Sequence, residues 1–235
     1  MRNRLEKPVL NYTFVPQTVS TPATNYPYLV GISGGSASGK TRFLHSLREL
    51  FSGAELCIIS QDNYYRSSEH HIYDHNGQVN FDLPECIDYA RFIADLQDLK
   101  NGKVVERKEY KFQIEGEEPA TLRFEPARII VIEGLFIFWF EEIFKLLDLK
   151  VFIDAADDVK LERRIRRDTT ERGIPYDQVI YQWKNHVLPA YEKYLLPFKN
   201  AADMIVNNNA HFNNSLNVLE NHFRVKLSES ALTGR

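Results

Sequence analysis

Five short apolar runs alternate along this chain with segments whose apolar residues recur at helical spacing. The apolar runs cover residues 28–32, 55–60, 127–134, 150–155 and 202–208. The helical spacing predicts helices over residues 41–51, 88–99, 141–149, 157–172 and 176–195, and another from about residue 212. Continuous apolar runs are typical of strands that are covered on both faces. The pattern therefore predicts an α/β fold, a three-layer sandwich with a mostly parallel sheet.

Three parts of the chain depart from this alternation. Residues 1–26 are polar, contain Pro and Thr and lack periodicity, so we expect a loose arm before one domain over residues 27–226. Residues 227–235 are expected to form a C-terminal tail. Within the domain, residues 104–124 alternate enough to predict short antiparallel strands, which would form a small insert over the sheet edge on the substrate side.

Charge and cysteine content narrow the classes of partner. The chain has 29 basic and 32 acidic residues and a net charge of -3, so it has no general attraction for nucleic acid. Cys57 and Cys86 are the only cysteines, which excludes a disulfide scaffold and favours the cytoplasm. The first residues lack a signal-peptide core, and Glu133 interrupts the richest apolar run, residues 129–140. We therefore expect neither export nor membrane spanning.

A Gly- and Ser-rich segment joins the first apolar run to the first predicted helix. Its residues are Gly34, Gly35, Ser36, Ala37, Ser38, Gly39, Lys40 and Thr41. They satisfy G-x-x-x-x-G-K-[ST], and a position between strand and helix is the context that supports a P-loop. In such a loop the backbone N–H groups bind phosphate, Lys40 reaches the β- and γ-phosphates of ATP, and Thr41 binds Mg²⁺. A plain Gly/Ser turn would require neither the lysine nor this spacing.

Two carboxylates follow predicted strands, where a parallel sheet presents its active-site groups. Glu133 ends the run IIVIE, at the point where an acid approaches Mg²⁺ in P-loop proteins, although Asp is the usual residue there. Capping of the next helix is the alternative role for Glu133. Asp62 follows the run ELCIIS and is the candidate base for the acceptor hydroxyl. From the residues alone, an Asx-turn with Asn63 explains Asp62 equally well.

The segment LERRIRRDTTERG carries five arginines within about three helical turns. They are Arg163, Arg164, Arg166, Arg167 and Arg172. Such crowding is unfavourable unless an anion or acidic side chains offset it. A helical lid over residues 163–175 that closes over ATP would bring Arg164 and Arg167 onto the transferring phosphoryl group. For Arg166, four residues after Glu162, we expect an exposed ion pair instead, and Asp168 and Arg172 have the same spacing.

The segment EHHIYDH contains His71 and His75 four residues apart, with Asp74 between them. On a helix this spacing would suit a metal ion. Asn76 and Gly77 mark a turn directly afterwards, however, and no further pair of ligands is near in the sequence. We therefore expect a flexible, polar loop on the substrate side.

The motifs GGSASGKT, SQDNYYR, NFDLP, VIEG and RRDTTERG, in this order and spacing, resemble the uridine kinase (uridine-cytidine kinase) family over roughly residues 28–224. Many NTPases share the P-loop, whereas the other motifs are close to family-specific. The resemblance implies a P-loop kinase fold and ATP- and Mg²⁺-dependent phosphorylation of the 5′-hydroxyl of uridine or cytidine, as in pyrimidine salvage. Members of the family are commonly tetramers, so a homo-oligomer would fit the resemblance.

The resemblance also implies roles for single residues. Asp62 matches the catalytic aspartate, and Asp82 of NFDLP matches a carboxylate that binds the ribose hydroxyls. The other matched positions are Tyr110 and Phe112 in the base pocket, Arg164 and Gln182 at the substrate, and Arg167 and Arg172 on the phosphate side of the lid.

Three positions depart from the family pattern. Lys111 replaces an Asp, Glu115 stands where a His is expected, and Ile174 stands where Arg is frequent. An acidic Glu115 would change the hydrogen-bond donors and acceptors that the pocket offers to the base, so the preferred nucleoside is left open. The phosphoryl-transfer residues are all present, so the reaction type is predicted more firmly than the nucleoside. Two alternatives stay open. One is a related P-loop kinase that acts on a different small-molecule alcohol, and the other is a catalytically weak ATP-binding module that signals to a partner.

Overall fold

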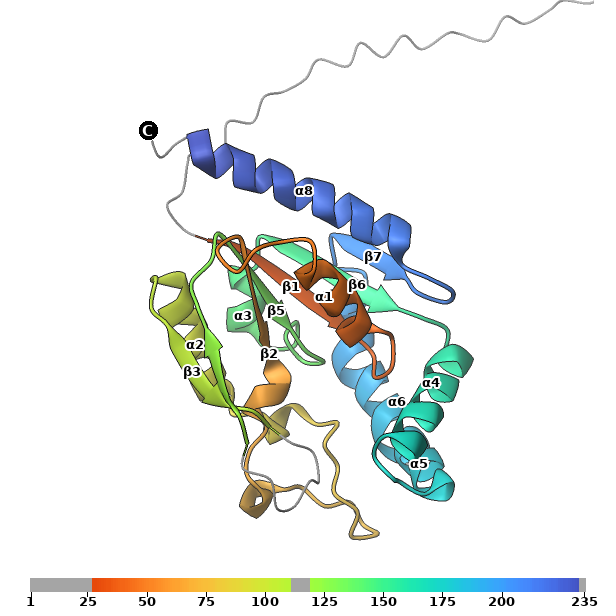
Figure 1. Ribbon diagram of the computed structural model, residues 1–235. Coiled ribbons are helices and arrows are strands. Elements are labelled where there is room, and N and C mark those ends of the chain that lie inside the picture. The colour runs from red at the N-terminus through yellow and green to blue at the C-terminus, as the bar shows by residue number, and fades with distance from the viewer. Residues whose placement is uncertain (1–26, 111–118, 233–235) are drawn as a thin grey trace, which may run out of the picture.

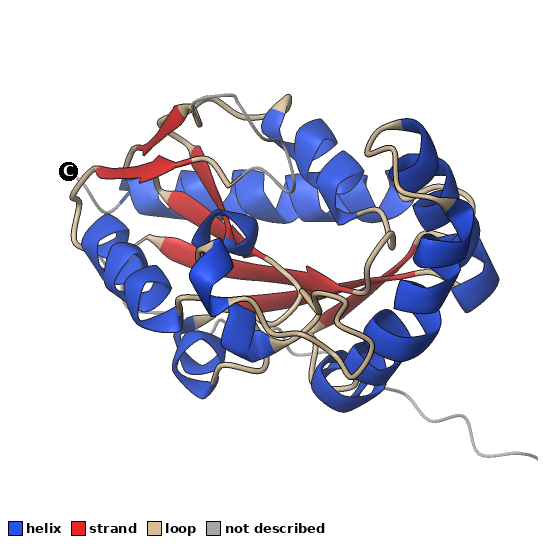
Figure 2. Ribbon diagram, turned by 90° about the horizontal axis from the view of Figure 1, so that it is seen from below, coloured by secondary structure: helices blue, strands red, loops and turns tan. Residues whose placement is uncertain are grey.

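Five parallel strands form the centre of the molecule, with helices on both faces (Figures 1 and 2). The computed structural model describes residues 27–110 and 119–232. The strands, in their order across the sheet, are β2 (Leu56–Ser60), β5 (Ile129–Glu133), β1 (Tyr28–Gly34), β6 (Leu149–Asp154) and β7 (Met204–Asn207). The α/β class and the parallel sheet predicted from the apolar runs are confirmed.

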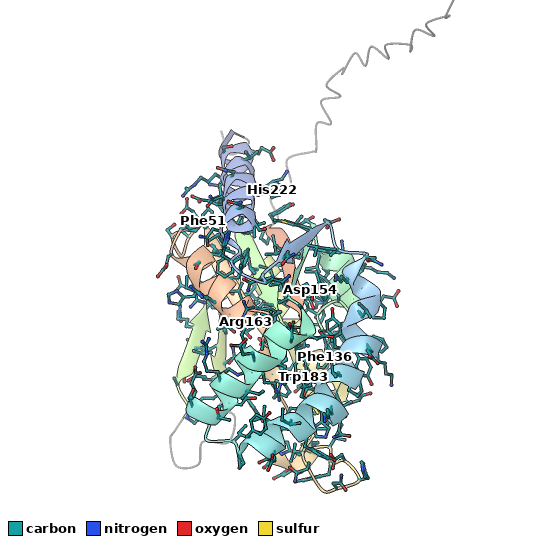
Figure 3. All side chains as sticks on the ribbon, turned by 90° about the vertical axis from the view of Figure 1, so that its right-hand side faces the viewer. Phe51, Phe136, Asp154, Arg163, Trp183 and His222 are labelled. Carbon is teal, nitrogen blue, oxygen red and sulfur yellow. The ribbon has the colours of Figure 1, made fainter. Side chains whose placement is uncertain are left out.

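One face of the sheet is covered by α1 (Lys40–Arg48) and α8 (Asn213–Leu232). Phe51, just after α1, packs against Phe223 of α8 with ring centroids 5.8 Å apart (Figure 3). Leu227, one helical turn later, is also buried in this core. Residues 227–232, which the sequence suggested as part of a tail, are therefore the last residues of α8, and Leu227 lies on its apolar face.

The opposite face is covered by α2 (Tyr89–Lys100), α3 (Glu141–Leu146) and a long helical run after α4 (Asp157–Thr170). The members of this run are α5 (Tyr176–Gln182), the π-helical turn Trp183–Val187, α6 (Leu188–Ala190), a second π-helical turn Tyr191–Leu195 and α7 (Leu196–Lys199). Sequence spacing predicted one regular helix here. Pro189 and Pro197 lie just after the two wide turns. A proline ring clashes with the carbonyl four residues earlier, and a wider turn relieves that clash.

The predicted insert is a two-stranded antiparallel ribbon of β3 (Val105–Lys108) and β4 (Thr121–Phe124). Three short 3₁₀ turns precede it: η1 (Gln61–Tyr64), η2 (Ser68–His70) and η3 (Pro84–Cys86). The expectations for residues 1–26, and for Lys111, Phe112 and Glu115, lie outside the described residues. None of the helices in the described ranges has the length and apolarity needed to cross a bilayer.

The strand register decides which groups meet at the carboxyl edge of the sheet. Glu133 at the end of β5 lies beside Ser60 of β2 on one side and Ile32 of β1 on the other. The chain leaves β1 toward β2 and later returns to the other side of β1 at β6. Such a reversal of direction opens a crevice at the carboxyl ends of the strands, and the predicted site residues lie there.

Candidate active site

A cavity of about 1060 Å³ opens at this edge of the sheet. The predicted residues that line it are Ser36, Ala37, Gly39, Lys40, Thr41, Asp62, Asp82, Tyr110, Glu133, Arg164, Arg167, Arg172 and Gln182. They come from the P-loop with the start of α1, η1, the loop before η3, the segment after β3, β5, α4 with the turn after it, and α5. The fold thus brings together segments that are far apart in the sequence, and Figure 3 labels Arg163 on α4.

The P-loop has the backbone of an anion-binding loop. Ala37 and Gly39 have φ values of +59° and +102°, and the N–H of Ser38 donates to the carbonyl of Gly35 at 3.1 Å. The Lys40 ammonium folds back over this loop and donates to the carbonyls of Gly34 and Gly35 at 2.8 and 3.2 Å. Left-handed backbone of this kind turns successive N–H groups toward one point, which is the geometry that phosphate oxygens require.

Asn208 supports the P-loop by a buried hydrogen bond and was not among the predicted site residues. Its side-chain amide donates to the carbonyl of Ser38 at 2.8 Å, and the residue is 5% exposed. A Cβ on Gly39 would overlap with this amide, so glycine is required there for space as well as for conformation. The available signal was the position of Asn208 directly after β7, at the same sheet edge as the other site residues.

Ser60 joins the two strand-end carboxylates. Its hydroxyl donates to Glu133 Oε1 at 2.5 Å and accepts from the backbone N–H of Asp62 at 3.1 Å. Ser60, and not Asp62, therefore caps the 3₁₀ turn η1. Glu133 does not cap the helix that follows β5, because α3 begins eight residues later with Phe140 at its N-cap. Both carboxylates are left to face the cavity.

The charges of these groups influence each other. Burial raises the pKa of Glu133, the charge of Asp62 raises it further, and Lys40 opposes the change. The pKa of Asp62 is also raised by the protein around it, although its side chain is open to the cavity, and Lys40, Arg172 and Arg167 oppose that rise. Burial lowers the pKa of Lys40, with both carboxylates acting against it. Asp62 and Glu133 are therefore weaker acids than usual, and Lys40 releases its proton more readily than usual. The three groups are close enough for their charges to influence each other.

The oxygen ligands in the cavity fit Mg²⁺ that arrives with a nucleotide. The described residues hold no cluster of three or more His, Cys, Asp or Glu that could bind a metal alone. Mg²⁺ in phosphoryl-transfer sites needs only one or two protein ligands beside phosphate and water. Glu133 and Thr41 both line the cavity and offer a carboxylate and a hydroxyl.

The five arginines of α4 and the turn after it all line the cavity, and three of them form ion pairs with Asp168. Asp168 is fully buried and lies within 2.8 to 3.3 Å of Arg164, Arg167 and Arg172. The predicted pairing of Asp168 with Arg172 is thus present, because the chain keeps right-handed helical backbone through Glu171 and residues four apart then meet on one face. The arginine crowding is offset partly from within the protein.

Arg164 and Arg166 differ in burial and in their contacts. Arg164 is buried and donates to the Ser36 hydroxyl at 2.8 Å and to Gln182 Oε1 at 3.1 Å, so it joins the P-loop to α5. For Arg166 the expected ion pair with Glu162 was wrong, since these two described side chains are not within 4 Å of each other. Arg166 is exposed on the rim of the cavity instead. An exposed i,i+4 pair gains too little to hold two long side chains together.

One part of the cavity has an aromatic wall. The Tyr65 ring lies 6.0 Å from Phe81 and 5.2 Å from Tyr110, and all three line the cavity. Asp82 follows Phe81, and its N–H donates to Asn80 Oδ1 at 2.9 Å. Burial raises the pKa of Asp82, while Arg164 and His186 oppose this change. Tyr65 and Phe81 lie within the motifs SQDNYYR and NFDLP, but no pattern in the sequence selects them separately.

Known proteins are similar to this chain in both sequence and fold. The model of the "Phosphoribulokinase / Uridine kinase family" matches residues 29–213. A uridine kinase of Lactococcus lactis subsp. lactis is 36% identical over 178 residues, which cover 76% of this chain and 86% of the relative. Uridine-cytidine kinase B of Dictyostelium discoideum is 31% identical over 210 residues, which cover 89% and 86%. The structure of a possible uridine kinase from Bacillus stearothermophilus has a TM-score of 0.52 at 19% identity, covering 77% of this chain and 89% of that one.

Proposed function

The chain belongs to the phosphoribulokinase/uridine kinase family, and we propose that it transfers the γ-phosphoryl group of ATP to the 5′-hydroxyl of uridine or cytidine. UMP or CMP and ADP would be the products, as in pyrimidine salvage. The observation that carries the proposal is the shared cavity of Lys40, Asp62 and Asp82. It combines a phosphate-binding cation, a candidate base and a carboxylate suited to sugar hydroxyls.

Asp62 is the group that takes the proton. The oxygen of the acceptor hydroxyl attacks the γ-phosphorus, the proton passes to the Asp62 carboxylate, and the bond to the β-phosphate oxygen breaks to release ADP. The raised pKa of Asp62 suits this role, because a stronger base accepts the proton more readily when it is ionised. The charges of Lys40 and Arg172 oppose the rise in the pKa of Asp62 and so favour its ionised form.

The cations supply most of the stabilisation in such a reaction. Lys40 would reach the β- and γ-phosphates, and Arg167 and Arg172, which line the cavity, would contact them from the lid. Glu133 and Thr41 would hold Mg²⁺, which supplies charge neutralisation between the phosphate oxygens. Asp82, Gln182 and Arg164 would bind the acceptor.

The test is ADP production with Mg·ATP against uridine, cytidine, other nucleosides, ribulose 5-phosphate and pantothenate. Strong turnover with uridine or cytidine is expected. Turnover with another alcohol and none with either pyrimidine nucleoside would retain the kinase and discard the acceptor. Little turnover with every alcohol, together with tight ATP binding, would instead identify an ATP-binding module.

A further inference from the structure

The loop that leads to Asp82 is fastened to the helices across the cavity by one carboxylate. Asp74 lies in a small hairpin in which Tyr73 bridges to Val79. Asp74 Oδ1 accepts hydrogen bonds from the backbone N–H groups of Asn76 and Gln78, at 2.8 and 2.9 Å. Asp74 Oδ2 accepts from the Tyr181 hydroxyl and from His186 Nε2, both at 2.7 Å. One side chain thus organises its own hairpin and binds two residues more than 100 positions later.

These contacts are shielded from water on the helix side. The side chains of His186 and Asp74 are 2% and 12% exposed. Burial alone would raise the pKa of Asp74, but the hydrogen bonds from Tyr181, Gln78 and His186 outweigh it and hold this pKa well below its usual range. Asp74 is therefore an ionised acceptor, and Nε2 of His186 carries the proton that it receives.

Two more contacts connect the hairpin with the same helices. Asn76 Nδ2 donates to the Tyr181 hydroxyl at 2.6 Å, and Gln178 Nε2 donates to Gln78 Oε1 at 3.2 Å. His186 lies in the π-helical turn that follows α5. Such turns change the direction of the side chains around them and are frequent at functional sites. The loop predicted to be flexible is thus held by side chains from a separate part of the fold.

The fastening lies close to Asp82 along the chain. Between η2 and η3, residues 71–83 contain the Tyr73–Val79 bridge and no named helix or strand, so this segment depends on the hydrogen bonds of the hairpin and on side-chain contacts. Asn80 continues the hairpin by donating its N–H to the carbonyl of Ile72 at 2.8 Å, and its own side chain accepts from the N–H of Asp82. Asp82 and His186 line the same cavity.

We infer that Asp74, Tyr181 and His186, together called the Asp74 latch, are positioning residues that hold Asp82 in place for the hydroxyls of the acceptor. The inference rests on the proposed function, because it assigns Asp82 to the sugar. The latch holds the loop, His186 also has an electrostatic effect on Asp82, and none of the three latch residues belongs to the P-loop. Its loss should weaken the binding of a ribose that has both vicinal hydroxyls more than the binding of a 2′-deoxyribose.

The experiment compares His186→Leu and Tyr181→Phe with the unmutated protein. His186→Gln restores a donor near the position of Nε2 and serves as the rescue. His75→Leu is the matched control, because His75 is exposed on the same hairpin and undergoes the same chemical change. The readouts are KM for uridine, 2′-deoxyuridine and ATP, kcat, and amide hydrogen exchange over residues 72–82.

In His186→Leu we expect KM for uridine to rise about tenfold, the usual result of losing a hydrogen bond to a charged group. The preference for uridine over 2′-deoxyuridine should fall, exchange over residues 72–82 should accelerate, and KM for ATP should stay within about twofold. Tyr181→Phe should show the same changes at smaller size, and His186→Gln should recover part of the loss. If His186→Leu does not fold, the same measurements on Tyr181→Phe test the inference.

Two results would overturn the latch: an unchanged KM for uridine although exchange accelerates, or an equal loss of uridine and 2′-deoxyuridine turnover. Failure of the proposed function is recognised separately, because the unmutated protein would then show no nucleoside turnover. In that case hydrogen exchange alone tests whether the Asp74 latch holds the hairpin, and equal exchange in His186→Leu and His75→Leu would refute it.

Discussion

The proposed donor side of the cavity is centred on one continuous loop, whereas the proposed acceptor side is assembled from segments that meet only in the folded chain. Residues 34–41 supply the phosphate-binding backbone and Lys40 within eight positions. Asp74, by contrast, reaches Tyr181 and His186 across 107 and 112 residues. A continuous loop depends on its own backbone geometry, and an assembled wall depends on every element that carries it. Changes on the two sides should therefore affect different kinetic constants.

Asp62 stands where the two sides meet, and its removal should have the largest effect. In Asp62→Asn the shape of the side chain is kept and the proton acceptor is lost, so kcat should fall by about 10²- to 10⁴-fold. KM for ATP and KM for the nucleoside should change little. Steady-state kinetics with calorimetric ATP binding would check this. Retention of most of the turnover would remove Asp62 from the role of base.

Asp82 tests the acceptor side alone. Asp82→Asn should raise KM for uridine by about 10- to 100-fold, because hydrogen bonds to a charged group are lost, while KM for ATP stays constant. Asp177→Asn is the control, since Asp177 is an exposed acid in the first turn of α5. An equal rise in both KM values would show that the two sides are not separable.

Much of the donor side could be predicted from the sequence because its signals are local. The P-loop is a fixed spacing of residues, and Asp62 and Glu133 each follow an apolar run. The strand order then determines that these ends are neighbours, as the pairing of Ser60 with Glu133 shows. The fold class followed from the same apolar runs, which is why it was predicted correctly.

The acceptor side could be predicted only in part, because its contacts depend on tertiary geometry. His186 appears in the sequence as one more position in a helical pattern, and its contact with Asp74 arises when a π-helical turn faces the hairpin. Asp168 was predicted as a partner of Arg172 alone, since spacing identifies neighbours on one helix. Its burial under Arg164 and Arg167 as well depends on how α4 packs.

Asn208 gives the matching test on the donor side. Asn208→Ala removes the buried donor to the Ser38 carbonyl and loosens the P-loop, so KM for ATP should rise by about 5- to 10-fold, the size expected for about 1 kcal/mol. KM for uridine should be unaffected. Asn217→Ala on the exposed side of α8 is the control. A larger effect on uridine than on ATP would contradict the division into donor and acceptor sides.

The smallest expected effect is on stability, at Glu133. Its pKa is raised in the folded protein by burial and by the charge of Asp62, so the folded chain holds this proton more tightly than the unfolded chain. The free energy of unfolding must then fall as pH rises from the unfolded pKa through the higher folded value. Glu133→Gln has no charge to bury, so it should be more stable than the unmutated protein at pH 8, by roughly 1 kcal/mol. The two should be nearly equal at pH 4.

Urea unfolding at both pH values, with Glu162→Gln on the exposed face of α4 as control, would measure this difference. The same variant should lose turnover with Mg·ATP, because the carboxylate that would hold Mg²⁺ is gone. A gain in stability combined with a loss of activity would show that Glu133 is kept for its chemistry at a cost to the fold. A loss of stability at pH 8 would mean instead that its bond with Ser60 outweighs the burial of its charge.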